Sequence, residues 1–354
     1  MVLPRKYHRM QLPREVIVGK GVIGRITEVF RRLGFEKSAL IVSGTKTYNI
    51  VGRTVAGLLE EEGLKVDNFL VDSATVNDVE AVEGTTKDLK PQVILGVGGG
   101  TKIDVAKLGS ARRKVPFISV PTTASHDGIA SPLSSVKDSE KPYSVMAQAP
   151  IAIIADTEVI MQAPRRYIIS GCGDVISKLT SVKDWELAHQ EKNEYYGEYA
   201  ASLALMSARL VMENAKLLES NEEEGLRILL EALISCGVAM SIAGSSRPCS
   251  GSEHLFSHAL DMIKSNHALH GEQCGVGAIM MAYLHKEDWA RIKDTLEMLD
   301  AATTADNLEV EDKDIVKALE MSATIRPGRY TILNKLNLDY EDYEKLAKAT
   351  GVIL

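Results

Sequence analysis

The chain has 354 residues, of which 45% are hydrophobic and 25% are charged, and its formal net charge is −7 at pH 7. These values are typical of a two-domain globular protein with a full core. The negative balance argues against an extended basic face for nucleic acid or anionic membranes. The longest apolar runs, such as residues 149–155, fall far short of the roughly 20 residues that cross a bilayer. Because residues 1–14 lack the apolar segment of a signal peptide, we expect a cytoplasmic protein without membrane insertion.

The first half of the chain alternates short apolar runs with helical patterns. This rhythm predicts parallel βαβ units with helices on both faces of one sheet, and ligands beyond the carboxyl ends of the strands. The predicted strands are residues 38–43, 65–71, 93–97, 117–120 and 151–155, and the predicted helices are 45–63, 76–88 and 103–112.

From about Met161 onward the pattern becomes helical, and no convincing strand follows Ala155. We therefore predict an α/β, Rossmann-like domain over residues 1–160 and an all-helical domain over residues 161–354. The predicted helices of the second domain are residues 173–187, 197–218, 225–243, 252–262 and 275–284, with a helical tail over 290–354.

Three consecutive glycines, Gly98 to Gly100, separate a predicted strand from the helix that begins near Lys102. A backbone that approaches a phosphate and then turns into a helix needs residues without a Cβ atom, and the helix start offers free N–H groups. A second loop, with Thr122, Thr123 and Ser125, follows the next strand. Two such loops together indicate a dinucleotide.

The glycine turn does not complete either of two common phosphate-binding patterns. Gly96 and Gly98 are followed by Thr101 where a G-x-G-x-x-G fingerprint has its third glycine. The Walker pattern also fails, because Lys102 follows a threonine. A purely structural tight turn remains the alternative for this segment.

Four of the eight histidines lie within seventeen residues: His254, His258, His267 and His270. His254 and His258 are four residues apart and share one helix face, without the glutamate of an H-E-x-x-H protease motif. Two or three converging N and O ligands would hold a catalytic metal, and the carboxylate expected to join them is Asp174, which we place at the opening of a helix. Surface or helix-capping histidines are the alternative.

The four cysteines, Cys172, Cys236, Cys249 and Cys274, show no C-x-x-C spacing. In a chain of this size the pattern indicates reduced, buried thiols rather than a disulfide framework.

Taken together, these segments resemble the superfamily of iron- or zinc-dependent polyol dehydrogenases and dehydroquinate synthases, and within it the archaeal sn-glycerol-1-phosphate dehydrogenases. The resemblance runs in order over roughly residues 40–285 and implies a dehydroquinate synthase-like fold. The segments that carry it are GVGGGTKIDVAK (96–107), VPTTASHDGIASPLSS (120–135), PIAIIADTEVI (150–160), GCGDVISKLTSVKDWELAH (171–189), RPCSGSEHLFSHAL (247–260) and HGEQCGVG (270–277).

The resemblance also implies roles for individual residues. Asp174, His254 and His270 match the metal ligands, with Zn²⁺ expected, whereas His267 matches no functional position. Asp127 and His258 would contact the substrate and take part in proton transfer, and Asp174 would also contact the substrate. The residues expected to bind NAD or NADP are Gly98, Gly99, Gly100, Thr101, Lys102, Asp104, Thr122, Thr123, Ser125 and Ser131.

The reaction implied is the reversible, NAD(P)- and zinc-dependent reduction of dihydroxyacetone phosphate to sn-glycerol 1-phosphate, the backbone of archaeal membrane phospholipids. A phosphorylated substrate needs cationic partners, and Lys178 and Arg247 lie beside the expected metal ligands in sequence. We therefore predict that both contact the phosphate.

Three other interpretations stay open at this stage. A glycerol dehydrogenase would share cofactor, metal and fold but would act on glycerol or dihydroxyacetone. A dehydroquinate synthase would need further basic residues, whose motifs we do not find, and a nucleotide-binding regulator would not need an intact ligand set. The resemblance further implies a homo-oligomer, either a dimer or an octamer, and we expect both NAD and NADP to serve.

Overall fold

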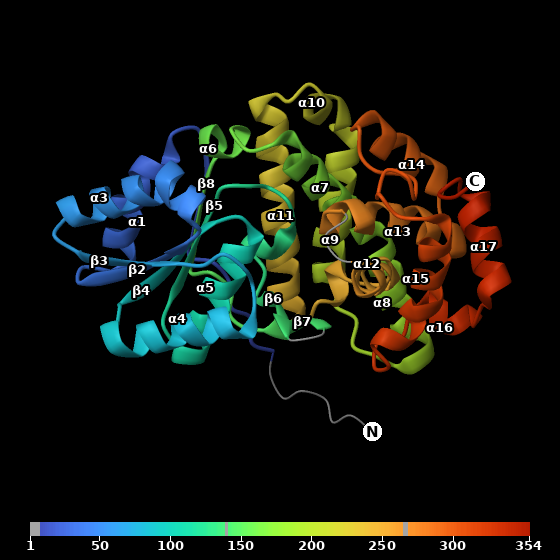
Figure 1. Cartoon of the computed structure of the whole chain (residues 1–354), viewed down its shortest axis with the longest axis horizontal. Coiled ribbons are helices and arrows are strands. Elements are labelled where there is room, and N and C mark those ends of the chain that lie inside the picture. Colours follow the sequence, from blue (N-terminus) through green and yellow to red (C-terminus); the bar gives the residue numbers. More distant parts are fainter. Residues whose placement is uncertain (1–7, 139–140, 265–267) are drawn as a thin grey trace.

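The computed structural model describes residues 8–138, 141–264 and 268–354. Within these residues, a six-stranded sheet with only parallel neighbours forms the core of the N-terminal part, in the order β1-β8-β5-β4-β2-β3 (Figure 1). The predicted parallel sheet is confirmed. The strands are β1 Glu15–Gly19, β2 Ser38–Ser43, β3 Lys65–Leu70, β4 Val93–Gly98, β5 Phe117–Pro121 and β8 Ala152–Asp156.

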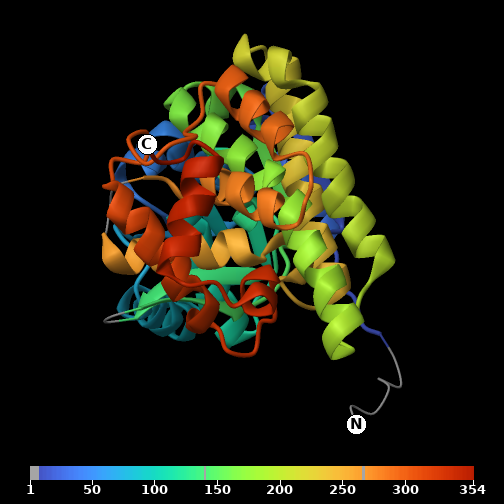
Figure 2. The same ribbon diagram turned by 90° about the vertical axis from the view of Figure 1, so that its right-hand side faces the viewer.

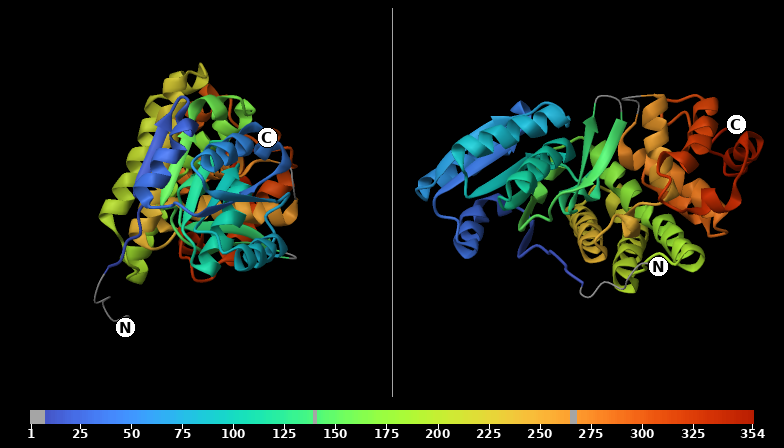
Figure 3. Two further views of the ribbon diagram at one scale, coloured as in Figure 1. Left: turned by 90° about the vertical axis from the view of Figure 1, so that its left-hand side faces the viewer. Right: turned by 90° about the horizontal axis from the view of Figure 1, so that it is seen from below.

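Helices cover both faces of this sheet (Figure 3). Successive side chains of a strand point to opposite faces, so Leu40 and Val42 of β2 pack with α4 and α5, whereas Ile41 packs with α1 and α3. The helices of this part are η1 Val22–Arg25, α1 Ile26–Leu33, α2 Thr45–Thr47, the π-helical turn η2 Tyr48–Gly52, α3 Arg53–Glu61, α4 Val76–Leu89, α5 Gly100–Arg113, η3 Asp127–Ile129 and α6 Thr157–Met161.

The prediction lacks helix α1 and also two β-features of the sheet domain. The edge strand β1 pairs with β8 in the register Glu15↔Ala152. An antiparallel hairpin of β6 Leu133–Asp138 and β7 Lys141–Met146 projects toward the helical part (Figure 3). The fully buried Lys107 holds the start of this hairpin, since its Nζ donates to the Leu133 carbonyl over 2.6 Å.

The C-terminal part is helical throughout the residues that the structure describes (Figures 1 and 2). We keep a domain boundary near residue 160 as a proposal, because β8 ends at Asp156 and only helices follow. These helices are α7 Arg165–Ile176, α8 Lys178–Lys192, α9 Glu198–Glu213, α10 Ala215–Glu219, α11 Glu223–Ala243, η4 Arg247–Cys249, α12 Ser252–Ile263, α13 His270–Leu284, α14 Trp289–Met298, α15 Asp312–Ile325, α16 Ile332–Leu336 and α17 Tyr340–Ala349.

Helix α11 runs between the two parts of the molecule (Figure 1). Its 21 residues are long and apolar enough to cross a membrane by length and composition, but 72% of the relevant window is buried inside the protein. This burial is typical of the core helix of a soluble protein.

The prediction that Asp174 opens a helix is wrong. Helix α7 begins at Arg165, and Asp174 lies in its last turn before a break at Ser177. The glycines are placed inside the helix because the backbone passes very close to other segments there. A Cβ on Gly171 would lie 2.0 Å from the Ala124 carbonyl oxygen, and one on Gly173 would lie 2.3 Å from that of Gly271.

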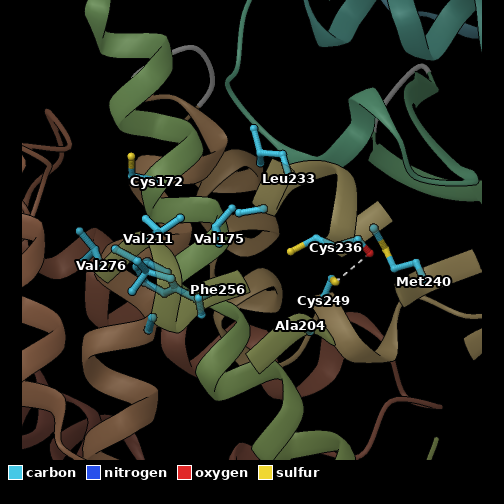
Figure 4. Packing of buried hydrophobic residues seen from close by; sticks show 14 of the residues in the cluster. Cys172, Val175, Ala204, Val211, Leu233, Cys236, Met240, Cys249, Phe256 and Val276 are labelled. Atoms are coloured by element: carbon cyan, nitrogen blue, oxygen red, sulfur yellow. Dashed lines mark hydrogen bonds between the residues drawn. The ribbon is translucent and has the colours of Figure 1, made fainter. Parts of the chain in front are cut away.

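All four cysteines are free and buried, as predicted. Cys172, Cys236 and Cys249 lie in the apolar core of the helical part, where the Cys249 thiol donates to the Cys236 carbonyl over 3.4 Å (Figure 4). Burial raises the pKa of Cys172 to about 12, which keeps this thiol protonated and unreactive.

Candidate active site

A cleft of about 820 Å³ lies between the carboxyl end of the sheet and the helical part. This volume is within the range of small-molecule sites. Both halves of the chain contribute to its wall, so the cleft combines the glycine turn of the sheet with the histidines of the helices. Its lining includes Gly100, Thr101, Asp104, Asp127 and Ser131 from the first half, and His254, His258, His270, Gln273 and Arg326 from the second.

Four potential metal ligands converge beside this cleft, and two of them, His254 and His270, line it. One atom each of Asp174, His254, His270 and Cys274 lies within 4.8 Å of the others. The imidazole Nε2 of His254 lies 3.6 Å from Oδ1 of Asp174, which is longer than a hydrogen bond. Two atoms that each lie about 2 Å from one shared ion would have a similar spacing.

A buried carboxylate orients the first of these histidines. Nδ1 of His254 lies 2.7 Å from Oε1 of Glu253. Glu253 also accepts from Ser181 Oγ over 2.5 Å and from the Gly251 N–H over 2.7 Å. Although burial raises the pKa of Glu253, these bonds and His254 lower it to about 2. The ionised carboxylate requires a proton on Nδ1, and Nε2, the other ring nitrogen, is directed at Asp174.

A chain of hydrogen bonds orients the second histidine in the same way. The amide nitrogen of Gln273 donates to Oδ1 of Asp261 over 2.9 Å, which leaves its carbonyl oxygen as an acceptor. Ser257 Oγ donates to that oxygen over 2.7 Å. With its only proton used, Ser257 accepts from Nδ1 of His270 at 3.0 Å. His270 therefore carries its proton on Nδ1, and its Nε2 lies 3.5 Å from Sγ of Cys274.

His270 and the neighbouring His258 are held neutral. Burial and the charge of His254 lower the pKa of His270 well below its usual range. Burial, His254 and two arginines lower that of His258 to about 3. The His258 ring lies 6.2 Å from the His270 ring at an interplanar angle of 26°. Neutral imidazole is the form that binds a metal, and the oxygen–nitrogen donor set fits Zn²⁺.

The metal-facing carboxylate is tied to both halves of the chain. Asp174 accepts from the Lys178 ammonium over 2.6 Å and from the Asp127 backbone N–H over 2.9 Å. Burial raises the pKa of Asp174, but Lys178 and the two histidines outweigh it and lower the pKa well below its usual range. Burial and the Asp174 charge raise the pKa of Asp127, whose Oδ2 lies 3.0 Å from the same ammonium.

The two phosphate-friendly loops of the first half lie against each other. Gly99 precedes helix α5 in extended backbone, and the Gly98 carbonyl accepts from the Thr122 N–H over 3.0 Å. A Cβ on Gly100 would lie 1.9 Å from Nε2 of His126, so only glycine leaves room for that ring. The helix start and the threonine loop thus form one surface beside the metal ligands.

Comparison with known proteins decides the family. Residues 17–164 match the family model described as iron-containing alcohol dehydrogenase. The chain is 53% identical to the glycerol-1-phosphate dehydrogenase [NAD(P)+] of Pyrococcus furiosus, over 98% of this chain and 100% of that protein. It is 52% identical to the protein of the same name from Methanosarcina mazei, over 97% of this chain and 96% of that one. The chain belongs to the glycerol-1-phosphate dehydrogenase family.

Solved structures support the fold of this family member. The glycerol dehydrogenase of Schizosaccharomyces pombe superposes with a TM-score of 0.82 at 21% identity, covering 98% of this chain and 90% of that one. A 1,3-propanediol oxidoreductase gives 0.76 at 15% identity, covering 98% and 100%. At these identities the likeness shows the fold alone.

The structure brings most of the predicted site residues of this family member to one place. Asp174, His254 and His270 converge, and Asp127 and His258 line the same cleft. Gly100, Thr101, Asp104 and Ser131 line it as well, whereas Lys102 turns its ammonium to the Asp72 carbonyl over 2.9 Å. The predicted cofactor contacts that are not part of the cleft lining are Gly98, Gly99, Thr122, Thr123 and Ser125. His267 lies outside the described residues.

Neither predicted phosphate contact has a free cationic group. Lys178 is fully buried between Asp127 and Asp174. The Arg247 guanidinium is buried too, and Glu194 accepts from its Nε over 2.7 Å and also from Nη2. The remaining guanidinium nitrogen of Arg247, Nη1, donates a hydrogen bond to the Tyr330 carbonyl over 2.9 Å. Their phosphate role stays a prediction that this geometry does not support.

Sequence reasoning missed the residues that orient the ligands. Glu253 directly precedes His254, and Gln273 follows His270 by three residues, so adjacency is the one signal that could have identified them. His126, whose ring centroid lies 6.3 Å from that of His270, sits inside the quoted threonine loop. Arg326 lies in no motif and comes into the cleft only through the fold.

Proposed function

We propose that this protein reduces dihydroxyacetone phosphate to sn-glycerol 1-phosphate with NADH or NADPH, reversibly and with Zn²⁺. The observation that carries the proposal is the single cleft that unites a glycine turn suited to a dinucleotide with two oriented histidines and one carboxylate. The family relatives above bear the same name over nearly the whole chain. An open fourth position beside three protein ligands is the usual arrangement of a catalytic zinc.

Different residues of the chain have different roles in this reaction. When bound, the metal would stabilise negative charge on the substrate oxygen and the nicotinamide would supply hydride. Glu253 and Ser257 hold the histidines, and Lys178 limits the repulsion between Asp174 and Asp127. Asp127, with its raised pKa, and the neutral His258 are the groups proposed to pass a proton to the product hydroxyl.

The test is oxidation of NADH and of NADPH with dihydroxyacetone phosphate and with dihydroxyacetone, before and after chelation and zinc add-back. We expect a strong preference for the phosphorylated substrate that chelation abolishes and zinc restores. A preference for dihydroxyacetone would make the protein a glycerol dehydrogenase. Bound metal without turnover of either substrate would point to a non-catalytic role.

We also propose how the product is used, where the enzyme is located and how many subunits it has. Its product would supply the glycerophosphate backbone of archaeal membrane phospholipids, and its partners are then small molecules, with neither nucleic acid nor membrane insertion. We propose a cytoplasmic homo-oligomer, either a dimer or an octamer. Light scattering of the purified protein separates these two states from a monomer.

A further inference from the structure

Two cationic residues of the cleft lining take no part in the site described above: Lys137, which is exposed, and Arg326, which is partly buried. Arg326 directly follows α15 and lines the cleft together with His258. Burial lowers the pKa of Arg326, and no carboxylate among the described residues offsets that effect. A guanidinium stays charged at neutral pH, so this group faces the cleft as a partly desolvated cation without a counter-ion.

A second arginine, Arg329, connects the segment that carries Arg326 to two serines of the cleft lining by hydrogen bonds. Arg329 donates through Nη2 to Ser246 Oγ over 2.6 Å and through Nη1 to the Ser250 carbonyl. Burial, Arg247 and Arg326 lower the pKa of Arg329 to about 10, which marks the excess of positive charge. Both serines line the cleft. The wall therefore offers hydroxyl groups beside a cation.

The positive charge of Arg326 and Arg329 acts on His258, the proposed substrate contact. Repulsion by the charges of Arg326 and Arg329 contributes to the lowered pKa of His258. Arg247, the third arginine of the group, is already neutralised by the two-pronged contact with Glu194. The unneutralised charge therefore lies on the cleft side, next to His258.

This arrangement matches one chemical class of substrate. The planar fork of a guanidinium pairs with two phosphate oxygens at once, and serine hydroxyls add donors to the same group. A phosphate dianion would supply the counter-ion that Arg326 lacks. An unphosphorylated triose would leave the partly buried cation unpaired, which costs binding energy.

We infer that Arg326 binds the phosphate of the substrate, with Ser246 and Ser250 beside it, and that Arg329 is a positioning residue for this wall. The inference rests on the proposed function and replaces Lys178 and Arg247 as phosphate contacts. Arg326 thereby determines the preference for a phosphorylated triose over a plain one.

The test compares Arg326→Gln and Arg326→Lys with the wild-type holoenzyme on dihydroxyacetone phosphate and on dihydroxyacetone. For R326Q we expect kcat/KM on the phosphorylated substrate to fall about 30- to 100-fold, as for loss of a charged hydrogen-bonded pair, whereas kcat/KM on dihydroxyacetone should not fall. The R326K variant keeps the positive charge but lacks the two-pronged guanidinium. Its kcat/KM on dihydroxyacetone phosphate should therefore lie between the values of the wild type and R326Q. Inhibition by inorganic phosphate, competitive with the phosphorylated substrate, should weaken in the same order.

The matched control is Arg227→Gln, because Arg227 is an exposed arginine paired with Glu224 on α11. Thermal melts and zinc content of all variants show whether they fold. If R326Q loses activity equally on both substrates, keeps full activity on both, or keeps wild-type phosphate inhibition, the assignment is overturned. A wild-type enzyme that prefers dihydroxyacetone would instead refute the proposed function itself.

For Arg329, the positioning role predicts a rise in KM for the phosphorylated substrate with little change in kcat when it is replaced by lysine. An Arg329→Lys enzyme with reduced kcat on both substrates would contradict that role.

Discussion

The Lys178 ammonium lies 2.6 Å from Oδ1 of Asp174, and almost nothing of either side chain is exposed to solvent. A second carboxylate, that of Asp127, lies 3.0 Å from the same ammonium. Two buried carboxylates beside one cation leave a net negative charge where the metal is expected. The Lys178 ammonium thus pairs with both carboxylates but cancels only one of their two negative charges.

Replacing Lys178 by methionine should therefore have opposite effects on the metal-free and the metal-bound protein. Without zinc, two buried carboxylates lose their partner, and we expect a loss of about 3–5 kcal/mol in the free energy of unfolding. With zinc, the more negative site should bind the cation more strongly, so the zinc-induced rise in Tm should exceed that of the wild type. Calorimetry with and without zinc measures both. The control is Lys183→Met, which removes a partly exposed pair with Glu287; an equal change there would contradict the argument.

The contact between Glu253 and His254 predicts an effect on metal affinity. Glu253→Gln removes the charge that fixes the protonated Nδ1 of His254 at 2.7 Å. Loss of such an orienting partner usually costs about 10- to 100-fold in affinity. Competition with a chelating dye gives the zinc dissociation constants. An unchanged constant would show that the helix alone orients the ring.

The lowered pKa of Glu253 also predicts how stability depends on pH. A carboxyl group with a pKa of about 2 in the folded state and about 4.3 in the unfolded state stabilises the fold above the higher value. That contribution is lost as the pH falls from about 4.3 toward about 2, where the folded group itself protonates. Urea unfolding of the metal-free wild type and of Glu253→Gln should differ most above this window and converge below it. A difference that does not vary with pH would refute the assignment.

Cys274 is the one potential ligand in the cluster that we expect to stay out of the coordination shell. Its Sγ lies 3.5 Å from Nε2 of His270, and burial raises its pKa well above the usual value. A fourth protein ligand would close the position that a substrate oxygen needs. The cobalt-substituted enzyme should therefore show no thiolate-to-metal charge-transfer band, and Cys274→Ala should leave its spectrum unchanged. A band that disappears in C274A would make the cysteine a ligand.

The close passage of α7 and α13 predicts that Gly173→Ala is damaging. The new Cβ would lie 2.3 Å from the Gly271 carbonyl oxygen, which is backbone and cannot rotate away. Overpacking of this kind typically costs about 1–3 kcal/mol, and the shift would also separate Asp174 from His270, which adjoin the two glycines. Unfolding and zinc titration should both respond. Gly57→Ala, in helix α3 with open space around it, should be neutral or stabilising.

Much of the sheet domain was predictable because its buried strands are continuous apolar runs. Strand β4 Val93–Gly98 and strand β5 Phe117–Pro121 match their predicted positions to within a residue. The hairpin was missed because its first strand, LSSVKD, is mostly polar and is held by Lys107 rather than by an apolar face. Edge strand β1 was missed because its partner lies more than a hundred residues away.

The candidate site shows a similar division. The convergence of Asp174, His254 and His270 could be predicted because the segments that carry the family resemblance contain all three. The neutralisation of Arg247 could not, because Glu194 reaches it from 53 residues away. The helix start before Asp174 was misplaced because glycines normally end helices, whereas here they allow two backbones to touch. Arg326 has no sequence signal at all, since only the fold brings it beside His258.

The pairing of β1 with β8 has a consequence for how the chain folds on the ribosome. Strand β1 leaves the exit tunnel before the other described strands of its sheet, yet it pairs with β8, the last of them, in the register Glu15↔Ala152. Asp156, at the end of β8, also accepts hydrogen bonds at 3.0 Å from the N–H groups of Gly21 and Ile23. At about 5–20 residues per second, synthesis of the intervening segment takes on the order of ten seconds. For that time β1 is an open strand edge that a nascent-chain chaperone can bind.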